Sequence, residues 1–372
     1  MSKPKVVTVV GTRPEIIRLA ATIKRLDRLT NHVLVHTGQN YDYELNEVFF
    51  EDLGLRKPDH FLSADVSSLG AALGSILTKT EAVLRQEQAD AFVVLGDTNS
   101  AISAVIAKRL KIPVYHLEAG NRSFDENVPE ETNRRMIDHV SDYNLVYSEH
   151  ARRNLLAEGI HPSRILLMGS PMREVLEMNR SQIEASDILE RQGLESGKFF
   201  LVSLHREENV DNPVRLAQSL ESLQAVASSY GLPVLVSTHP RTRNRLEAQP
   251  EAAKQGLVFH PPFGFNDYVR LQMEAKVVLS DSGTIAEESS ILGFPAITLR
   301  DAIERPEAID GGAIITAGVT PDSVLDAIEH ALDAFGHTDV PAEYKVSNSS
   351  VRVVNFIRST VATHHERAGI RQ

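Results

Sequence analysis

The stretch VVTVVGTRPEIIRLAATIKRLDRL, residues 6–29, decides the fold class. It opens with five residues of strand type, passes through a glycine turn and continues as a helical segment. A continuous apolar run of this kind is typical of a strand that is buried on both faces of a parallel sheet. Pro14 suits the first turn of a helix, because the N–H that proline lacks would have no helical partner there. The stretch therefore predicts one strand–loop–helix unit of an α/β protein.

The same unit recurs along the chain. Eleven short apolar runs carry the strand signal, and helical stretches such as NSAISAVIAKRL lie between most of them. The runs are VVTVV, HVLVHT, AFVVLGD, IPVYHLE, YNLVYS, RILLMGS, FFLVSLH, PVLVSTHP, LVFHP, KVVLSDSG and PAITL. Eleven strands fit two doubly wound sheets better than one, whereas a single (β/α)8 barrel would need eight evenly spaced units. The sequence thus predicts an α/β protein with two doubly wound domains.

The length of 372 residues also predicts two domains, because one hydrophobic core rarely grows this large. We place the boundary in the segment LMGSPMREV, where a Ser-Pro turn follows the last strand of the first series. The first domain is predicted to span residues 1–168 and the second residues 169–351. The last segment, about residues 352–372, is predicted to be a helix that packs back on the first domain.

Composition excludes several functional classes. The chain contains no cysteine, which rules out disulfides, a thiol nucleophile and a thiolate zinc site. A net charge of −11 argues against a broad surface for nucleic acid or anionic membrane. No apolar run reaches the roughly 18 residues of a membrane-spanning helix, and the N-terminus lacks the core of a signal peptide. We therefore expect a cytoplasmic protein with no nucleic-acid partner and no membrane insertion.

The common cofactor and metal motifs are missing from the sequence. It has neither G-x-G-x-x-G nor the P-loop pattern G-x-x-x-x-G-K-[ST], so neither kind of nucleotide site is supported. It has no H-E-x-x-H sequence, which makes a metal site a weak interpretation. We expect neither a cofactor nor a metal.

Polar clusters follow six of the predicted strands. They are GTRPE, GDTNS, HLEAGNR, LHREEN, THPRTR and SDSGT. In open α/β sheets, ligands bind at the carboxyl ends of the strands. Clusters at equivalent positions in two domains therefore predict one cleft between two facing sheets.

Three acidic residues are the candidate catalytic groups. Asp97 and Glu118 end two predicted strands, and Glu130 lies in the first turn of the helix that NVPEETNRR begins. Each also has an ordinary interpretation, Asp97 as a helix cap and Glu130 as a complement to the helix dipole.

The helix that contains Glu130 presents two faces. Glu131 is explained by an ion pair with Arg135 one turn later. Glu130, Asn133 and Arg134 share the other face, which we expect to point back toward the strand end at residue 118. Arg134 is therefore also a candidate substrate-binding residue.

The candidate anion ligands lie near two predicted helix starts, where free N–H groups attract negative charge. They are Arg13 and Arg18 in the first domain, and Ser282, Gly283, Thr284, Arg300 and Arg305 in the second. Glu288, one turn after Thr284, is placed to accept hydrogen bonds from a ribose. His205 and His239 end two strands of the second domain, and their corresponding positions favour a shared functional role over two structural histidines.

Taken in order, the motifs GTRPEIIR, GDTNS, HLEAGNR, PEETNR, HREEN, DSGTIAEES and ERPEA resemble the non-hydrolysing UDP-N-acetylglucosamine 2-epimerase family. The resemblance runs from residue 11 to about residue 308. It implies two Rossmann-like domains facing across a cleft, as in GT-B glycosyltransferases, and a homodimer. By position it implies catalytic roles for Asp97, Glu118, Glu130 and His205, and UDP-sugar contacts for Arg13, Ser282, Gly283, Glu288 and Arg305. FGFNDY would contact uracil.

The resemblance also implies a reaction. A carboxylate removes the C2 proton while UDP leaves C1, the resulting glycal is reprotonated on its other face, and UDP adds back. Opposite faces need more than one acid/base group, which explains several converging carboxylates. The implied function is interconversion of UDP-GlcNAc and UDP-ManNAc for cell-surface polysaccharide synthesis.

Four departures from the commonest family pattern bear on the substrate. Arg18 replaces Lys, Thr284 replaces Gly, TGQNYDYEL replaces a Gln-His stretch tied to activation by UDP-GlcNAc, and NRSFDENVPEE is short. With these departures, the sequence resembles a sister branch of the family that converts UDP-2-acetamido-2,6-dideoxy-L-talose to UDP-N-acetyl-L-fucosamine. A GT-B glycosyltransferase or a UDP-sugar-binding protein is the alternative of another class.

Overall fold

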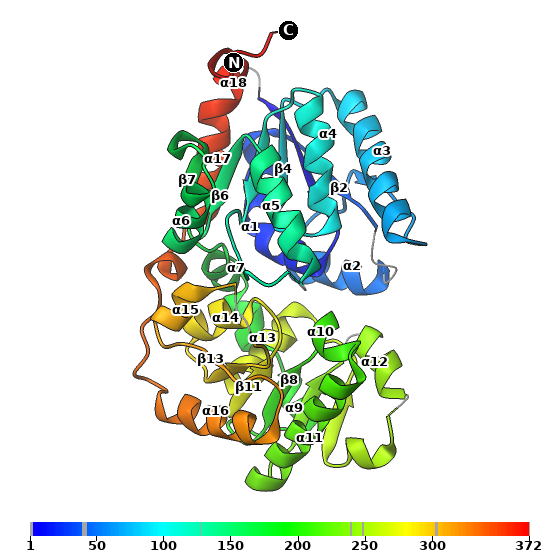
Figure 1. Ribbon diagram of the computed structural model, residues 1–372, viewed down its shortest axis with the longest axis vertical. Helices are drawn as coiled ribbons and strands as arrows, with labels where there is room; N and C mark the ends of the chain where they lie inside the picture. The colour runs from blue at the N-terminus through cyan, green and yellow to red at the C-terminus, as the bar shows by residue number, and fades with distance from the viewer. Residues whose placement is uncertain are drawn as a thin grey trace. The chain divides into compact units, whose positions relative to one another are not determined.

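The computed structural model describes residues 3–38, 43–126, 128–238, 240–247, 249–301 and 304–371. The chain forms two compact units, each with its own sheet (Figure 1). Unit 1 comprises Met1–Met178 and Lys345–Gln372, and unit 2 comprises Asn179–Tyr344.

Unit 1 is built on a parallel sheet in which the strands lie in the order β3-β2-β1-β4-β5-β6-β7. The strands are β1 (Lys5–Val10), β2 (Asn31–His36), β3 (His60–Phe61), β4 (Ala91–Leu95), β5 (Val114–Leu117), β6 (Tyr143–Val146) and β7 (Ile165–Leu167). The α-helices are α1 (Arg13–Leu29), α2 (Tyr43–Asp52), α3 (Leu69–Glu87), α4 (Ala104–Arg109), α5 (Pro129–Val140), α6 (Glu149–Ala157), α7 (Met172–Met178), α17 (Ser349–Thr360) and α18 (His364–Arg367). Short 3-10 turns are η1 (Asn99–Ser103), η2 (Pro162–Arg164) and η5 (Val361–Thr363).

Unit 2 repeats this plan with the strand order β10-β9-β8-β11-β12-β13, again all parallel. The strands are β8 (Phe200–Ser203), β9 (Val234–Ser237), β10 (Leu257–His260), β11 (Val277–Ser280), β12 (Ala296–Thr298) and β13 (Ile315–Thr316). The α-helices are α8 (Arg180–Ala185), α9 (Ile188–Gln192), α10 (Glu207–Val210), α11 (Pro213–Tyr230), α12 (Pro240–Glu247), α13 (Phe265–Glu274), α14 (Ile285–Leu292), α15 (Pro306–Asp310) and α16 (Pro321–Asp333). The 3-10 turns are η3 (Glu251–Lys254) and η4 (Ala342–Lys345).

The predicted α/β class with two doubly wound sheets is confirmed, and each of the eleven predicted strands corresponds to a strand of one sheet. The strands β3 and β13 were not predicted. Each has only two residues and lies at the edge of its sheet, so neither carries an apolar run that a sequence pattern can detect.

The continuous apolar runs fill the core because both faces of each sheet are covered. In β1, for example, Val6, Val7, Val9 and Val10 are all fully buried. Removing such side chains from water is the dominant favourable term in folding. Among the residues that the structure describes, every helix is too short or too polar to cross a membrane.

The C-terminal segment belongs to unit 1, where α17 packs on α1 (Figure 1, red and blue). Glu174 of α7 accepts hydrogen bonds from the hydroxyls of Ser349 and Ser350, at 2.9 and 2.5 Å. These bonds and the packing of α7 on α1 keep α7 in unit 1, although the sequence-based boundary at residue 168 assigned it to the second domain.

Strand order reverses between β1 and β4 in unit 1 and between β8 and β11 in unit 2. The connections that leave such neighbouring strands turn to opposite faces of the sheet, which opens a crevice at their carboxyl ends. The clusters GTRPE and GDTNS follow β1 and β4, and LHREEN and SDSGT follow β8 and β11. The fold thus brings four of the six polar clusters to two such crevices, one in each unit.

Gly120, two residues after Glu118, provides a test of how closely the loop after β5 packs on α6. It has a φ of +79°, and a Cβ there would lie 2.4 Å from the carbonyl oxygen of Ala151. Gly159 has a similar φ of +85° with open space around it. We expect Gly159→Ala to lose about 1 kcal/mol of unfolding free energy from backbone strain alone. Gly120→Ala should lose about 2–4 kcal/mol, because overpacking adds to that strain.

Urea unfolding followed by circular dichroism measures both losses. Equal destabilisation by the two variants would contradict the close approach of Gly120 to Ala151.

Candidate functional site

The crevice of unit 1 holds Asp97 in the turn after β4. Its Oδ2 accepts hydrogen bonds from Nε and Nη2 of Arg134, at 3.0 and 2.5 Å. Its carbonyl oxygen accepts a third from Nδ2 of Asn133, at 2.9 Å. Asn133 and Arg134, which were predicted to lie on the face of α5 that points toward Glu118, thus both bind Asp97. Two charge-assisted hydrogen bonds to one carboxylate oxygen hold Asp97 in place.

Glu118 lies one residue beyond β5, in a backbone conformation with a φ of +65°. Its carboxylate pairs with Arg18 of α1 and also accepts from the Tyr147 hydroxyl at 3.4 Å. Only 9% of its side chain is exposed. A left-handed backbone at a residue other than glycine costs roughly 1–3 kcal/mol and tends to mark functional sites. Arg18, predicted as an anion ligand, thus binds a carboxylate of its own unit.

A buried cluster supports the two strand ends that carry these acids. The imidazole of His116 hydrogen-bonds the carbonyl oxygen of Gly96 at 2.8 Å and lies 2.9 Å from the Asp138 carboxylate. Asp138 also accepts from the N–H of Gly120 at 3.2 Å and from Arg122 at 2.8 Å. Asp138 therefore connects the turn before Asp97 with the loop after Glu118. The sequence patterns did not identify His116 or Asp138 as part of the site, because only the fold brings Asp138 of α5 to the end of β5.

Glu130 is the second residue of α5, after Pro129, and is half-buried. Its neighbour Glu131 is almost fully buried and lies 3.0 Å from Arg135, which confirms the predicted ion pair. Burial raises the pKa of Glu131, but the Ser123 amide and the Arg134 charge outweigh it and hold this pKa below its usual value. Glu131 is thus a structural anion that fixes the loop before α5.

The start of α1 differs from the prediction. The N–H groups of Gly11 and Thr12 donate to Oε2 of Glu15, at 2.9 and 2.7 Å, in a capping box. They are therefore occupied by the helix itself, and the expected anion site on free N–H groups is wrong for these two amides. The Arg13 guanidinium lies 5.4 Å from the centre of the Phe49 ring, in a cation–π contact.

The crevice of unit 2 holds His205, just after β8, beside Asp281, just after β11. Nδ1 of His205 lies 3.0 Å from the Asp281 carboxylate, which also accepts the backbone N–H groups of His205 and Arg206. Burial raises the pKa of Asp281, but His205 and these amides outweigh it and lower the pKa below its usual value. A carboxylate at Nδ1 places the ring proton there and leaves the lone pair of the neutral imidazole on Nε2.

The predicted diphosphate ligands lie beside this pair. The N–H of Thr284 donates to Oγ of Ser282 at 3.3 Å, and the two hydroxyl oxygens lie 2.9 Å apart at the start of α14. A Cβ on Gly283 would come within 3.5 Å of the Arg206 guanidinium, so the chain passes close to a cation there. Glu288 accepts from the Gln272 side chain at 2.6 Å, which orients its carboxylate.

Two arginines near α15 are paired with acids. Nη2 of Arg305 lies 3.1 Å from Glu287, and both side chains are almost fully buried. Arg300, also predicted as an anion ligand, donates two hydrogen bonds to Glu304, at 2.6 and 2.9 Å.

His239 lies outside the residues that the structure describes. In the predicted uracil segment FGFNDY, the ring of Phe263 stacks on that of His260 with their centres 4.0 Å apart. The last residue of that segment, Tyr268, is partly buried, and removal of its hydroxyl from solvent raises the pKa of that group. Among the described residues, no group of three or more His, Asp or Glu side chains is arranged to hold a metal ion.

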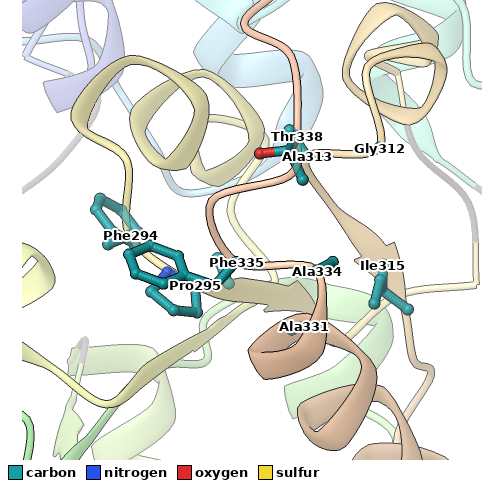
Figure 2. A pocket seen from close by; sticks show the side chains of 10 residues that line it. Phe294, Pro295, Gly312, Ala313, Ile315, Ala331, Ala334, Phe335 and Thr338 are labelled. Atoms are coloured by element: carbon teal, nitrogen blue, oxygen red, sulfur yellow. The ribbon is translucent and has the colours of Figure 1, made fainter.

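A separate small pocket in unit 2 lies at the amino end of β12. It is lined mainly by apolar side chains, including Phe294, Pro295, Ile315 and Phe335 (Figure 2). Its volume of about 30 Å³ is that of a single water molecule. Since ligands of open α/β sheets bind at the carboxyl ends, this pocket is not a candidate for the substrate.

Comparison with known proteins adds to this geometry. The sequence model of the family described as UDP-N-acetylglucosamine 2-epimerase matches residues 23–358. The chain belongs to this family. The structure resembles a UDP-N-acetylglucosamine 2-epimerase from Rickettsia bellii, with 43% identity, a TM-score of 0.93 and coverage of 99% of this chain and 100% of that one.

Two further relatives show the range of substrates named within the family. The Methanocaldococcus jannaschii UDP-GlcNAc 2-epimerase, solved with UDP-GlcNAc and UDP, shares 35% identity and has a TM-score of 0.90, covering 95% of this chain and 99% of that chain. A UDP-2,3-diacetamido-2,3-dideoxy-D-glucuronate 2-epimerase from Pseudomonas aeruginosa is 33% identical over 95% of this chain and 99% of that protein.

The pairing of His205 with Asp281 can be tested directly. Asp281→Asn replaces one acceptor oxygen with a donor, so it should release the ring and mix the two neutral tautomers. Long-range 1H–15N NMR of labelled histidine, assigned with His205→Gln, measures the tautomer. Loss of an oriented acid/base group should lower turnover of the substrate by about 100-fold or more.

The exposed Asp187, paired with Arg191 in unit 2, supplies the control. Asp187→Asn should change neither the NMR signal of His205 nor the turnover. An unchanged Nδ1–H signal in Asp281→Asn would show that Asp281 does not orient the ring.

Proposed function

We propose that the protein is a non-hydrolysing UDP-N-acetylglucosamine 2-epimerase that interconverts UDP-GlcNAc and UDP-ManNAc. The observation that carries the proposal is the pair of carboxylates Asp97 and Glu118 on neighbouring strands, each paired with a guanidinium, in a chain of this family. The presence of both acids favours catalysis over simple UDP-sugar binding. A GT-B glycosyltransferase would also need an acceptor site, and its reaction would require fewer converging acids than epimerisation does.

The proposed chemistry begins with the C2 proton of the sugar. No carbonyl group is adjacent to C2, so enolisation cannot remove this proton, and elimination of UDP from C1 supplies the alternative. Glu118 and Asp97 exchange protons at the two faces of C2, with Glu130 as a partner carboxylate. Arg18 and Arg134 hold the first two acids in fixed directions, which keeps them ready for proton transfer.

The leaving diphosphate gains charge as the C1–O bond breaks. Arg13, Arg305 and the hydroxyl and amide groups of Ser282, Gly283 and Thr284 would stabilise that charge, and Glu288 would bind the ribose. His205 would assist beside the diphosphate and C1, with Nε2 as its proton-exchanging atom. His239 is proposed as a further substrate contact.

We also propose that the enzyme acts as a cytoplasmic homodimer in the synthesis of a cell-surface polysaccharide. The support is the family resemblance. Light scattering of the purified protein tests the dimer, and a mass equal to that of one chain would exclude it.

An isotope-exchange assay separates the candidate functions. The pure protein is incubated with UDP-GlcNAc in D2O, with neither acceptor nor cofactor, and the sugar is followed by NMR. We expect deuterium at C2 together with a manno product. Binding without exchange would indicate a different sugar or a binding protein. UDP-2-acetamido-2,6-dideoxy-L-talose and UDP-2,3-diacetamido-2,3-dideoxy-D-glucuronate then serve as alternative substrates.

The same assay tests the role of Glu118. Glu118→Gln keeps the shape of the side chain but cannot take a proton at C2, so exchange should fall by at least about 100-fold. Affinity for UDP, measured by calorimetry, should stay within about twofold. The partly exposed Glu149, paired with Arg152 on α6, provides the control Glu149→Gln, which should exchange at the parent rate. Exchange at the parent rate in Glu118→Gln would exclude Glu118 as the base.

A further inference from the structure

Glu15 is a buried acid that the proposed chemistry leaves unused. It lies in the first turn of α1 with 1% of its surface exposed. Its Oε2 accepts the N–H of Gly11 at 2.9 Å, the N–H of Thr12 at 2.7 Å and the Thr12 hydroxyl at 2.9 Å. Its Oε1 accepts the hydroxyl of Thr98 at 2.9 Å.

These contacts exceed what a helix cap requires. A capping box is complete with the bonds between Glu15 and Thr12. The bond to Thr98 instead joins residues 83 positions apart and crosses from the loop after β1 to the turn after β4. Those are the two strands between which the order reverses, so Glu15 spans the base of the unit 1 crevice.

Both ends of this bridge adjoin residues of the proposed reaction. Thr12 directly precedes Arg13, a proposed diphosphate ligand, and Thr98 directly follows Asp97, a proposed acid/base group. Oxygen Oγ1 of Thr98 also accepts the N–H of Ser100 at 3.2 Å, so its hydroxyl hydrogen is directed to Glu15. The carboxylate therefore fixes the Asp97 turn relative to the Arg13 loop.

We propose that Glu15 is a positioning residue for the epimerase reaction. Through the hydroxyl of Thr98, it fixes the position of Asp97 relative to Arg13. The inference rests on the proposed function for its chemical meaning. Burial raises the pKa of Glu15 to about 7, so an ionised Glu15 weakens the folded state near neutral pH.

Substitutions at Thr98 separate the bridge from the cap. Thr98→Val removes the hydroxyl and keeps Glu15 together with its donors at the start of α1, Gly11 and Thr12. Thr98→Ser keeps the hydroxyl and is the matched control. We expect Thr98→Val to lower kcat about 10- to 100-fold, because small displacements of a catalytic group have effects of this size. KM should change less than about threefold, and Thr98→Ser should restore most of kcat.

Glu15→Gln completes a double-mutant cycle. Its amide oxygen can still accept the donors at the helix start, while its NH2 group faces Thr98 and reverses that bond. If both residues act through one contact, the double variant should be no less active than the less active of the two single variants. Additive losses would contradict the bridge.

Amide hydrogen exchange supplies a measurement that does not depend on activity. The N–H groups of Gly11 and Thr12 are held by Glu15, so Thr98→Val should increase their exchange even though it lies in another loop. A merely local role for Thr98 would change exchange only around residues 98–103. That result, or equal kcat for Thr98→Val and Thr98→Ser, overturns the proposal.

The two proposals fail in different ways. A parent protein that turns over no UDP-2-acetamido sugar overturns the proposed function, and the positioning role with it. A parent protein that is active, with kcat unchanged in Thr98→Val, overturns the positioning role alone.

Discussion

The reversal of strand order is the constraint on which both halves of this structure depend. Where neighbouring parallel strands send their connections to opposite faces, the backbone groups just beyond the sheet lose their ladder partners. In unit 1 the carboxylate of Glu15 meets that demand, and in unit 2 the carboxylate of Asp281 does the same. Each unit thus closes the base of its crevice with a buried acid. The backbone N–H groups beneath the proposed ligand groups therefore already have hydrogen-bond partners.

Electrostatic pairing is the second common feature. Asp97, Glu118 and Asp281 each have a cationic or imidazole partner within their own unit, and Arg305 is held by Glu287. Unpaired charges in such sheltered positions would be costly. The pairs therefore allow several acids and bases to gather near strand ends while each keeps one direction. A set of groups with fixed directions is what proton transfer at a single carbon atom requires.

Sequence patterns predicted the sheets well because a parallel strand buried on both faces must be apolar throughout. They failed where the information is not local. The contact between Glu174 and the serines at the start of α17 joins residues 175 and 176 positions apart, so no boundary signal near residue 168 could reveal it.

The site was predicted only in part for the same reason. Helical periodicity grouped Asn133 and Arg134 on one face, but their contacts with Asp97 depend on the path of the loops, which periodicity does not reveal. The cap at Glu15 was readable, since Thr12 and Glu15 fit the S/T-x-x-E pattern. Asp281 lies next to Ser282 in the SDSGT cluster, but its role depends on the neighbouring strand β8, which only the fold brings to it.

The return of the chain to unit 1 has a consequence for biosynthesis. Unit 2 is one uninterrupted segment, whereas unit 1 consists of two pieces separated by the whole of unit 2. On the ribosome, every residue of unit 2 is made before α17 exists, and α17 covers part of α1. Since domains tend to fold as their residues become available, unit 2 can fold before unit 1 is complete. Unit 1 cannot cover α1 completely until α17 has been synthesised.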